Sequence, residues 1–208
     1  MGPNQVRKRG QLRVAKSDVS INMMLRQIAL IEQAIGWGIL LIAFFRARPW
    51  TQFQSRESHS SSSTWGGILI LIGLAFLLVP YSPADSQPSL LMLEISIALC
   101  PIPIFIALAA LVSTRKKRWL PADGTRPQLP RTGIYRAVRH PVYTALLALA
   151  AATAIGRTWW PMMVPGFFFL ILGIEFRSTA DDSGLANVFQ DEFFEHQAQT
   201  RSYLPLIR

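Results

Sequence analysis

A short basic segment in the second half of the chain contains the residues best suited to chemistry. Residues 132–143 have the sequence TGIYRAVRHPVY. Within this segment, Tyr135 and Tyr143 supply aromatic faces that carry hydroxyl groups, and Gly133 permits a turn that other residues resist. His140 stands directly before a proline, so a polar ring is expected at the rigid start of a helix. This segment is the first candidate for a binding site.

The same segment also allows a purely structural interpretation. Arg139 can extend its charged end from the membrane edge into water, and tyrosine rings are common in the interfacial layer. A basic, tyrosine-containing stretch beside a membrane span is therefore not by itself evidence of function. The His-Pro pair is harder to explain in this way, because a membrane edge does not require a polar ring held rigidly at a helix start.

Three charged residues further along the chain form a second candidate group. Arg177 is followed by the adjacent acids Asp181 and Asp182. In a structural interpretation, the acids lie in a solvated turn before a helix that starts near Gly184, where they suit the helix dipole, and Arg177 anchors a span end. That helix is predicted to have an apolar stripe that lies on the membrane surface or packs over a bound cofactor. The stripe consists of Leu185, Val188, Phe189 and Phe193.

The composition is typical of a membrane protein. Half of the 208 residues are hydrophobic and only 16% are charged. The single cysteine, Cys100, rules out a disulfide framework, and the three histidines lack metal-binding spacing, so no metal is expected. No glycine-rich nucleotide-binding loop occurs. The net charge of +9 does not predict nucleic-acid binding, because the cations flank apolar runs instead of covering a soluble face.

Five apolar runs are predicted to form membrane-spanning helices. They are residues 28–45, 65–79, 90–112, 142–155 and 159–174. Pro101 and Pro103 should kink the third run, because each removes a backbone donor. Only residues 156–158 separate the last two runs, which are therefore expected to form a tight transmembrane hairpin. We predict an all-α polytopic membrane protein with about five spans and a cytoplasmic C-terminal amphipathic helix.

These runs divide the chain into three regions. They are a basic leader (1–27), a three-helix membrane region (28–114) and a region with both candidate groups (115–208). An N-terminus outside the cell places the eight cations of residues 115–139 inside, at the cost of six leader cations outside. The opposite orientation exposes the eight-cation segment. We therefore expect an integral protein of a cell inner membrane or endomembrane, with both candidate groups facing the cytoplasm.

The spacing Gly-x-Tyr-x-x-x-Arg-His-Pro-x-Tyr of residues 133–143 resembles the signature of a known family. This is the family of isoprenylcysteine carboxyl methyltransferases and their phospholipid methyltransferase relatives, integral membrane enzymes that use S-adenosylmethionine. The family pairs the motif with two acids, a leucine, a Phe-Gly-x-x-Tyr-x-x-Tyr segment and a basic residue before Leu-Pro. The matching residues here are Asp181, Asp182, Leu185, Phe189, Arg201, Leu204 and Pro205. The resemblance covers roughly residues 115–208.

The resemblance implies a binding site for S-adenosylmethionine and a methyl-transfer reaction. The positions assigned to cofactor binding are Gln128, Leu129, Tyr135, His140, Pro141, Val142, Tyr143, Asp181 and Asp182. Arg177 matches an arginine that the family associates with substrate, and we expect it to act in catalysis together with Arg139.

The chain departs from the family's pattern in its acids and in its tail. Aspartate replaces glutamate at both acidic positions, which shortens the reach toward a ligand by one methylene. Gln190 stands in place of the family's glycine, and Phe193 and His196 stand in place of its two tyrosines. The tail changes are tolerable if the C-terminal helix only covers the site.

The chemistry of these residues suits S-adenosylmethionine, which has a sulfonium, an ammonium, a carboxylate and an adenine. Asp181 can pair with the ammonium, His140 with the carboxylate, and tyrosine rings with the sulfonium or adenine. A carboxylate acceptor is already an anion and needs no base, and Arg177 can hold it with two hydrogen bonds. An amine or thiol acceptor requires a base, for which Glu175, His140 or one of the paired acids is available.

We therefore expect an S-adenosylmethionine-dependent enzyme that methylates the carboxylate of a lipophilic, isoprenylcysteine-like or prenylated substrate. The cofactor would enter from the cytoplasm and the substrate from the surrounding membrane lipids. Phospholipid N-methylation and thiol S-methylation are the nearest alternatives. An NADPH-dependent membrane reductase resembling the sterol reductases, and a non-catalytic membrane scaffold, are alternatives of other classes. The oligomeric state stays open.

Overall fold

The regular structure of the chain is helical. The computed structural model describes residues 3–46, 61–78, 89–115, 129–157 and 160–203. The elements in chain order are α1 (Pro3–Arg46), α2 (Ser61–Leu78), α3 (Leu90–Leu99), α4 (Pro101–Arg115), the 3-10 helix η3 (Gly133–Arg136), α5 (Pro141–Arg157), α6 (Trp160–Phe189) and α7 (Asp191–Gln199). Within these ranges no strand forms, and Val138 and Arg201 make an isolated parallel bridge. The predicted all-α class is confirmed.

Within the described residues, three helical stretches are long and apolar enough to cross a membrane. They are Ser20–Arg46, Leu90–Thr114 and Trp160–Phe189. Two shorter apolar helices, Ser63–Leu78 and Pro141–Gly156, lie at the second and fourth predicted runs. A helix is therefore present at each of the five predicted positions, and three of the helices have the length and composition of membrane spans.

The third predicted span is interrupted at Cys100, between α3 and α4. Pro101 is the first residue of α4, and Pro103 follows in the same turn. Neither proline has a backbone N–H to donate, so the hydrogen-bond ladder of a continuous helix cannot form across this point. At the point where the sequence predicted a kink, the structure has the end of one helix and the start of the next, and α3 and α4 together still form one apolar stretch.

α2 and α6 pack against each other through glycines. The four glycines occur in two pairs seven residues apart, Gly66 and Gly73 on α2, Gly166 and Gly173 on α6. A Cβ atom on Gly73 would lie 2.5 Å from the backbone nitrogen of Leu170, and one on Gly173 would lie 2.6 Å from that of Ile70. The two backbones therefore approach closely in antiparallel orientation, as small residues allow between membrane helices.

α5 packs against α1, α3 and α4, and it is the most buried of these four helices. Its small side chains, including Ala150 and Ala154, lie in the main hydrophobic core. Polar groups tie this core together, since Ser96 on α3 donates to the carbonyl of Ala152 at 2.6 Å and Trp37 on α1 donates to Thr153 at 3.3 Å. α6 packs mainly on α2, so the successive helices α5 and α6 have different principal neighbours.

The region of the paired acids differs from the sequence prediction. α6 continues without a break through Asp181, Asp182 and Gly184 to Phe189, so the prediction of a turn before a new helix near Gly184 is wrong. Within this continuous helix, the hydroxyl groups of small polar residues bond back to carbonyls one turn earlier. Thr179 donates to Glu175 O at 2.8 Å, and Ser183 donates to Thr179 O at 2.8 Å.

The chain turns at Gln190, between α6 and α7. Gln190 has φ 45° and ψ −122°, a backbone conformation that favours glycine. The new helix starts at Asp191, and Phe193 on α7 packs with Leu129 and with Phe189 at the end of α6. The predicted apolar stripe is thus divided between two helices, and it closes a small core around Leu129.

Gln190→Gly is expected to stabilise the protein by roughly 1 kcal/mol, because glycine adopts a positive φ without steric strain. Gln190→Ala is the matched control, since alanine shortens the side chain and keeps the strain. The check is the midpoint of thermal unfolding in one nonionic detergent for the wild type and both variants. Equal stabilisation by alanine would show that the side chain, and not the backbone, sets the effect.

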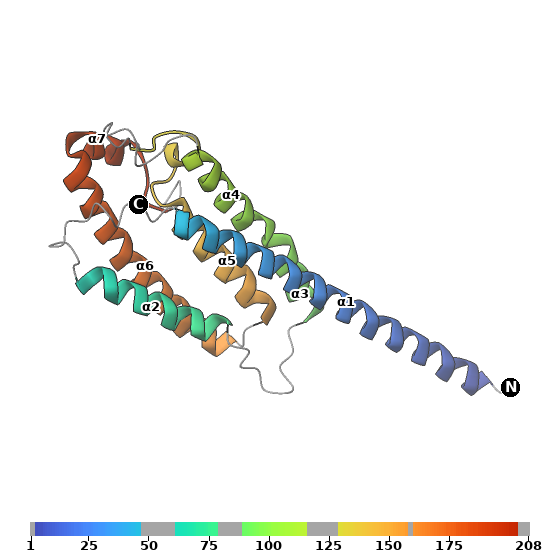
Figure 1. Cartoon of the computed structure of the whole chain (residues 1–208). Coiled ribbons are helices and arrows are strands. Elements are labelled where there is room, and N and C mark those ends of the chain that lie inside the picture. Colours follow the sequence, from blue (N-terminus) through green and yellow to red (C-terminus); the bar gives the residue numbers. More distant parts are fainter. Residues whose placement is uncertain (1–2, 47–60, 79–88, 116–128, 158–159, 204–208) are drawn as a thin grey trace.

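Several segments distant in sequence lie at one end of the bundle. Figure 1 shows the end of α4, the start of α5 and the C-terminal half of α6 beside α7 at this end, while the start of α1 projects away at the other. α2, α4, α5 and α6 run in alternating directions, so the end of α4, the start of α5 and the end of α6 come to the same end of the bundle. Both groups of candidate residues therefore lie at the same end of the molecule.

Candidate functional site

The start of α5 contacts the second half of α6 through two residue pairs, each made of one aspartate of α6 and one residue at or near the start of α5. His140 Nε2 lies 2.9 Å from Asp182 Oδ1, and the hydroxyl of Tyr143 donates to Asp181 Oδ2 at 2.6 Å. The two candidate groups recognised in the sequence are therefore in direct contact. Since each acid pairs with a different residue, Asp181 and Asp182 face different surroundings.

Local backbone geometry places His140 at the start of α5. Gly133 has φ +66°, and a Cβ atom there would collide with the side chain of Ser113 on α4, so the predicted need for glycine is confirmed. Pro141 is the first residue of α5, where a missing N–H costs nothing. The His140 carbonyl accepts from the amides of Tyr143 and Thr144, both at 3.1 Å.

The residues after α7 form a wall beside this junction. The backbone amide of Arg139 donates to Arg201 O at 2.8 Å, and that of His140 donates to Ser202 O at 3.0 Å. The Arg139 guanidinium donates to Thr200 O at 2.7 Å and to Ser202 Oγ at 2.7 Å, and it lies 3.5 Å from Asp182 Oδ2. Arg139 therefore joins the start of α5, the C-terminal segment and the acid on α6.

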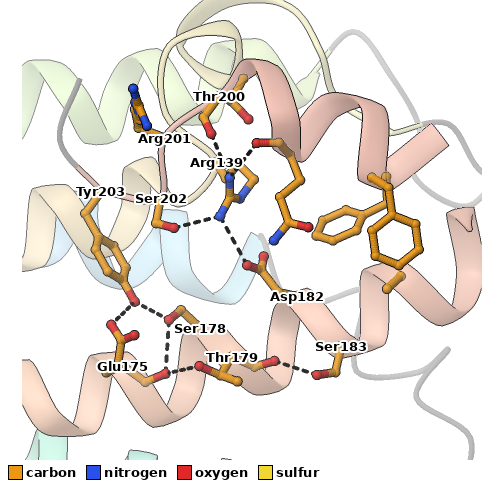
Figure 2. A pocket seen from close by; sticks show the side chains of 14 residues that line it. Arg139, Glu175, Ser178, Thr179, Asp182, Ser183, Thr200, Arg201, Ser202 and Tyr203 are labelled. Carbon is orange, nitrogen blue, oxygen red and sulfur yellow. Dashed lines mark hydrogen bonds and ion pairs between the residues drawn. The ribbon is translucent and has the colours of Figure 1, made fainter. Parts of the chain in front are cut away.

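A cleft of about 480 Å³ opens between α6, α7 and this C-terminal segment (Figure 2). One face of α6 forms its floor, because residues three, four, seven and eight positions apart point to the same side of a helix. The residues on this floor are Glu175, Ser178, Thr179, Asp182, Ser183 and Ala186. The other lining residues are Arg139, Phe193, Phe194, Gln197, Thr200, Arg201, Ser202 and Tyr203.

The cleft is lined by charges of both signs and by aromatic rings. Asp182 and Glu175 contribute carboxylates, and Arg139 contributes a guanidinium whose Nε is buried with no hydrogen-bond partner in the described part of the chain. Phe193 and Phe194 stand edge to face at 5.9 Å between ring centroids. The lining can thus interact with a cation, an anion and a flat ring at once.

Glu175 is the second acid that lines the cleft, and it lies at the end opposite the phenylalanines. The hydroxyl of Tyr203 donates to Glu175 Oε2 at 3.1 Å and also bonds to Ser178 (Figure 2). Burial and the neighbouring Glu175 carboxylate raise the pKa of Tyr203 to about 12, although the Ser178 hydrogen bond opposes this shift. Tyr203 is therefore a protonated donor at neutral pH.

Arg177 is directed toward α2 and Asp181. Its NH1 donates to the hydroxyl of Ser63 on α2 and lies 3.4 Å from the Ser63 carbonyl, and its Nε lies 3.8 Å from Asp181 Oδ1. Asp181 in turn accepts from Tyr143 on α5. This series of polar contacts links α2, α6 and α5. The residues that make it are not among those that line the cleft in the described structure.

The structure separates the predicted site residues into three sets. Arg139 and Asp182 line the cleft. Behind it, His140 and Tyr143 are buried and contact the acids, and Asp181 and Arg177 lie on the α2 side. The remaining described residues are buried in hydrophobic cores, where burial raises the pKa of the Tyr135 hydroxyl. These are Leu129, Tyr135, Pro141 and Val142, whereas Gln128 lies outside the described residues.

Much of the cleft lining is not predicted by the sequence. The sequence indicates Glu175 only as a possible base and gives no role to Ser178, Thr179 and Ser183. A usable signal was present, because Glu175, Thr179, Asp182 and Ala186 recur at helical spacing once α6 is continued past the end of its apolar run. No comparable signal marks Tyr203, whose place depends on the bridge between the C-terminal segment and the start of α5.

Comparisons with known proteins add no further information on the site. No protein-family model, no curated protein and no solved structure matches this chain.

Proposed function

We propose that this chain is an S-adenosylmethionine-dependent membrane methyltransferase that acts on a lipophilic acceptor. The observation that supports this most is the cleft in which Asp182, Arg139 and the phenylalanine pair line one space of about 480 Å³. A carboxylate, a guanidinium and an aromatic wall suit the ammonium, carboxylate and flat base of an amino-acid group linked to a nucleoside. The resemblance of residues 133–143 to the methyltransferase signature supports the same function.

The residues of the cleft suit each part of this cofactor. Asp182 can accept hydrogen bonds from the ammonium, and the positive charge of the Arg139 guanidinium, whose Nε is itself buried, suits the carboxylate. The exposed ring of Phe194 provides apolar surface for the adenine, and the buried Phe193 supports it edge to face. When bound, the cofactor supplies an electrophilic methyl group on a sulfonium.

The protein's own part in such a reaction is orientation and exclusion of water. Asp182 is held by His140 at 2.9 Å and by Arg139 at 3.5 Å, so its carboxylate is oriented before a ligand arrives. The C-terminal segment is attached to α5, where Thr144 donates to Tyr203 O at 2.6 Å. A pre-oriented site lowers the entropic cost of aligning an acceptor with the methyl group.

The helices suggest how the site is placed relative to the bilayer. We propose that all five apolar helices cross the membrane in alternating directions, with α5 and α6 as the closing pair. Positively charged loops then face the cytoplasm, together with the cleft. The protein would be integral to a cell inner membrane or endomembrane, and its acceptor would approach within the bilayer.

Calorimetry on detergent-purified protein tests the cofactor class. We expect S-adenosylhomocysteine and S-adenosylmethionine to bind and NADPH not to bind. Binding of NADPH alone would favour a reductase, and binding of none of the three at millimolar concentrations would favour a non-catalytic scaffold. Tritiated methyl transfer into a lipid extract of the host then identifies the acceptor, for which the resemblance favours an isoprenylcysteine-like carboxylate.

A further inference from the structure

A second group of polar side chains lies within the apolar helices, where α1, α3 and α5 meet. Gln33 on α1 is only 3% exposed, and its Nε2 donates to Ser96 Oγ on α3 at 3.3 Å. Ser96 in turn donates to the Ala152 carbonyl on α5 at 2.6 Å. These three residues are not among those that line the cleft in the described structure. The group is therefore separate from the candidate functional site.

The orientation of the Gln33 amide follows from these hydrogen bonds. The single hydrogen of the Ser96 hydroxyl is used on the Ala152 carbonyl, so Ser96 accepts from Gln33 and cannot donate to it. The amide nitrogen therefore faces Ser96, and the amide oxygen is directed away from it. That oxygen, Oε1, is buried and has no hydrogen-bond partner in the described part of the chain. A buried acceptor of this kind is unfavourable until a donor or a cation reaches it.

The preceding residue, Glu32, adds a second acceptor of the same kind. Its Oε2 is also buried, and the described residues provide neither a hydrogen-bond donor to it nor an ion pair with Glu32. The carboxylate interacts electrostatically with Cys100, which lies one turn after Ser96 on α3. An acid within a membrane span is rare and normally has a partner. The two unpartnered atoms are both oxygens on the side of α1 that faces α3.

The break between α3 and α4 supplies further oxygen atoms at this place. The carbonyls of Ile97 and Leu99 have no regular helical donor, because the residues four positions further on are Pro101 and Pro103. Interrupted membrane helices bind small cations through backbone carbonyls released in this way. The break starts one turn after Ser96, to which α1 is bonded. Side-chain and backbone oxygens are thus gathered where α1 meets the break.

We propose that Glu32, Gln33 and the break between α3 and α4 form a binding site for a monovalent metal cation. Oxygen ligands suit hard cations. The site has one carboxylate, so a monovalent ion gives a neutral buried pair, whereas a divalent ion leaves an excess positive charge away from water. Among the described residues, no group of three or more His, Cys, Asp or Glu side chains is placed to hold a metal ion, which agrees with a monovalent ion. The site goes beyond the proposed methyl transfer and does not depend on it.

Thermal unfolding of the detergent-purified full chain tests this site. NaCl and KCl are each compared with choline chloride at equal ionic strength, because choline is too large for a buried oxygen site and reproduces only the screening by salt. We expect Na+ or K+ to raise the unfolding midpoint by about 5 °C at saturation, since an ion that binds only the folded state stabilises it. Glu32→Gln keeps the shape of the side chain and removes its charge, so it should abolish this shift.

Glu94→Gln is the matched control for Glu32→Gln. Glu94 is an exposed acid on α3, two residues before Ser96, so its amide variant should keep the ion-dependent shift. A shift that is absent from the wild type, or that Glu32→Gln retains, would overturn the assignment. A larger shift with CaCl2 than with either monovalent salt would overturn the monovalent class.

A labelling experiment on the wild type tests the site without a variant. A hydrophobic carbodiimide couples to protonated carboxyl groups within detergent or lipid, and peptide mass spectrometry locates the labelled acid. At ten times its Kd, the ion that raises the midpoint should slow labelling of Glu32 about tenfold, because it occupies the carboxylate. Labelling of the exposed Glu94 should not change. Labelling of Glu32 that is the same in the metal salt and in choline chloride would mean that a proton alone neutralises this acid, and the proposed cation site would be wrong.

Discussion

Asp182→Asn is expected to weaken binding of S-adenosylhomocysteine by about tenfold to hundredfold, which corresponds to losing a charge-assisted interaction of roughly 1.5–3 kcal/mol. Asp182 is an acid on the cleft floor, and its pairing with His140 and Arg139 fixes the orientation of its carboxylate. Asparagine keeps the shape of the side chain and an oxygen that can accept from His140, so the change removes charge with little disturbance of packing. Calorimetry on the purified variant measures the effect.

Asp181→Asn is the matched control for this prediction. The two acids are adjacent in sequence, yet Asp181 pairs with Tyr143 and Arg177 on a different face of α6. Its amide variant should bind S-adenosylhomocysteine within about threefold of the wild type, because it makes no charge-assisted contact with a ligand in the cleft. A larger loss in Asp181→Asn than in Asp182→Asn would place the cofactor between α5, α6 and α2, and the proposed use of the cleft would be wrong.

Gly73→Ala is expected to destabilise the protein by about 1–3 kcal/mol, the range found for overpacked interiors. The added Cβ would lie 2.5 Å from Leu170 N and 2.7 Å from Gly166 O, both of which are backbone atoms. Rotamer changes cannot relieve such a clash, so α2 and α6 must move apart. Denaturation in a fixed detergent mixture, followed by the loss of helix signal, measures the change.

Gly67→Ala on the same helix is the control for Gly73→Ala. A Cβ atom on Gly67 meets no atom within 4 Å of the described structure, so alanine should be neutral or slightly stabilising through its higher helix propensity. The two variants make the same chemical change six residues apart. Equal destabilisation of both would show that the glycines serve α2 itself and not its contact with α6.

The packing of α2 on α6 also bears on the site. Ser63 lies at the start of α2 and accepts from Arg177, which pairs with Asp181. A shift of α2 in Gly73→Ala would therefore disturb Arg177 before it reaches the cleft, whose lining comes from α6, α7 and the segments beside them. Binding of S-adenosylhomocysteine should survive in the fraction of Gly73→Ala that remains folded.

Much of the fold was accessible from local sequence features. Each apolar run predicted a helix and each is helical, because an uninterrupted apolar segment satisfies its backbone groups internally. Pro101 and Pro103 predicted a kink where α3 ends and α4 begins, since the loss of a backbone donor does not depend on the neighbours. Gly133 predicted a turn because glycine has no Cβ atom and adopts a positive φ without strain, and its φ is positive.

The end of α6 was predicted wrongly, because local signals there conflict. The composition of residues 181–184 is typical of a turn, yet the helix continues to Phe189. Contacts from outside the helix decide the outcome, since His140 and Tyr143 bind the acids and the Leu129 cluster receives Phe189. Tertiary contacts of this kind override weak local propensity.

The helical class, the apolar segments and the location of His140 at a helix start can be predicted from the sequence, because they follow from backbone donors and side-chain polarity within a few residues. That Asp182 lines the cleft and Asp181 does not could not be predicted, since neighbouring helix positions point about 100° apart and their surroundings depend on distant segments. The tertiary structure also decided that Arg177 is bound to α2, because glycines distant in sequence bring those backbones together.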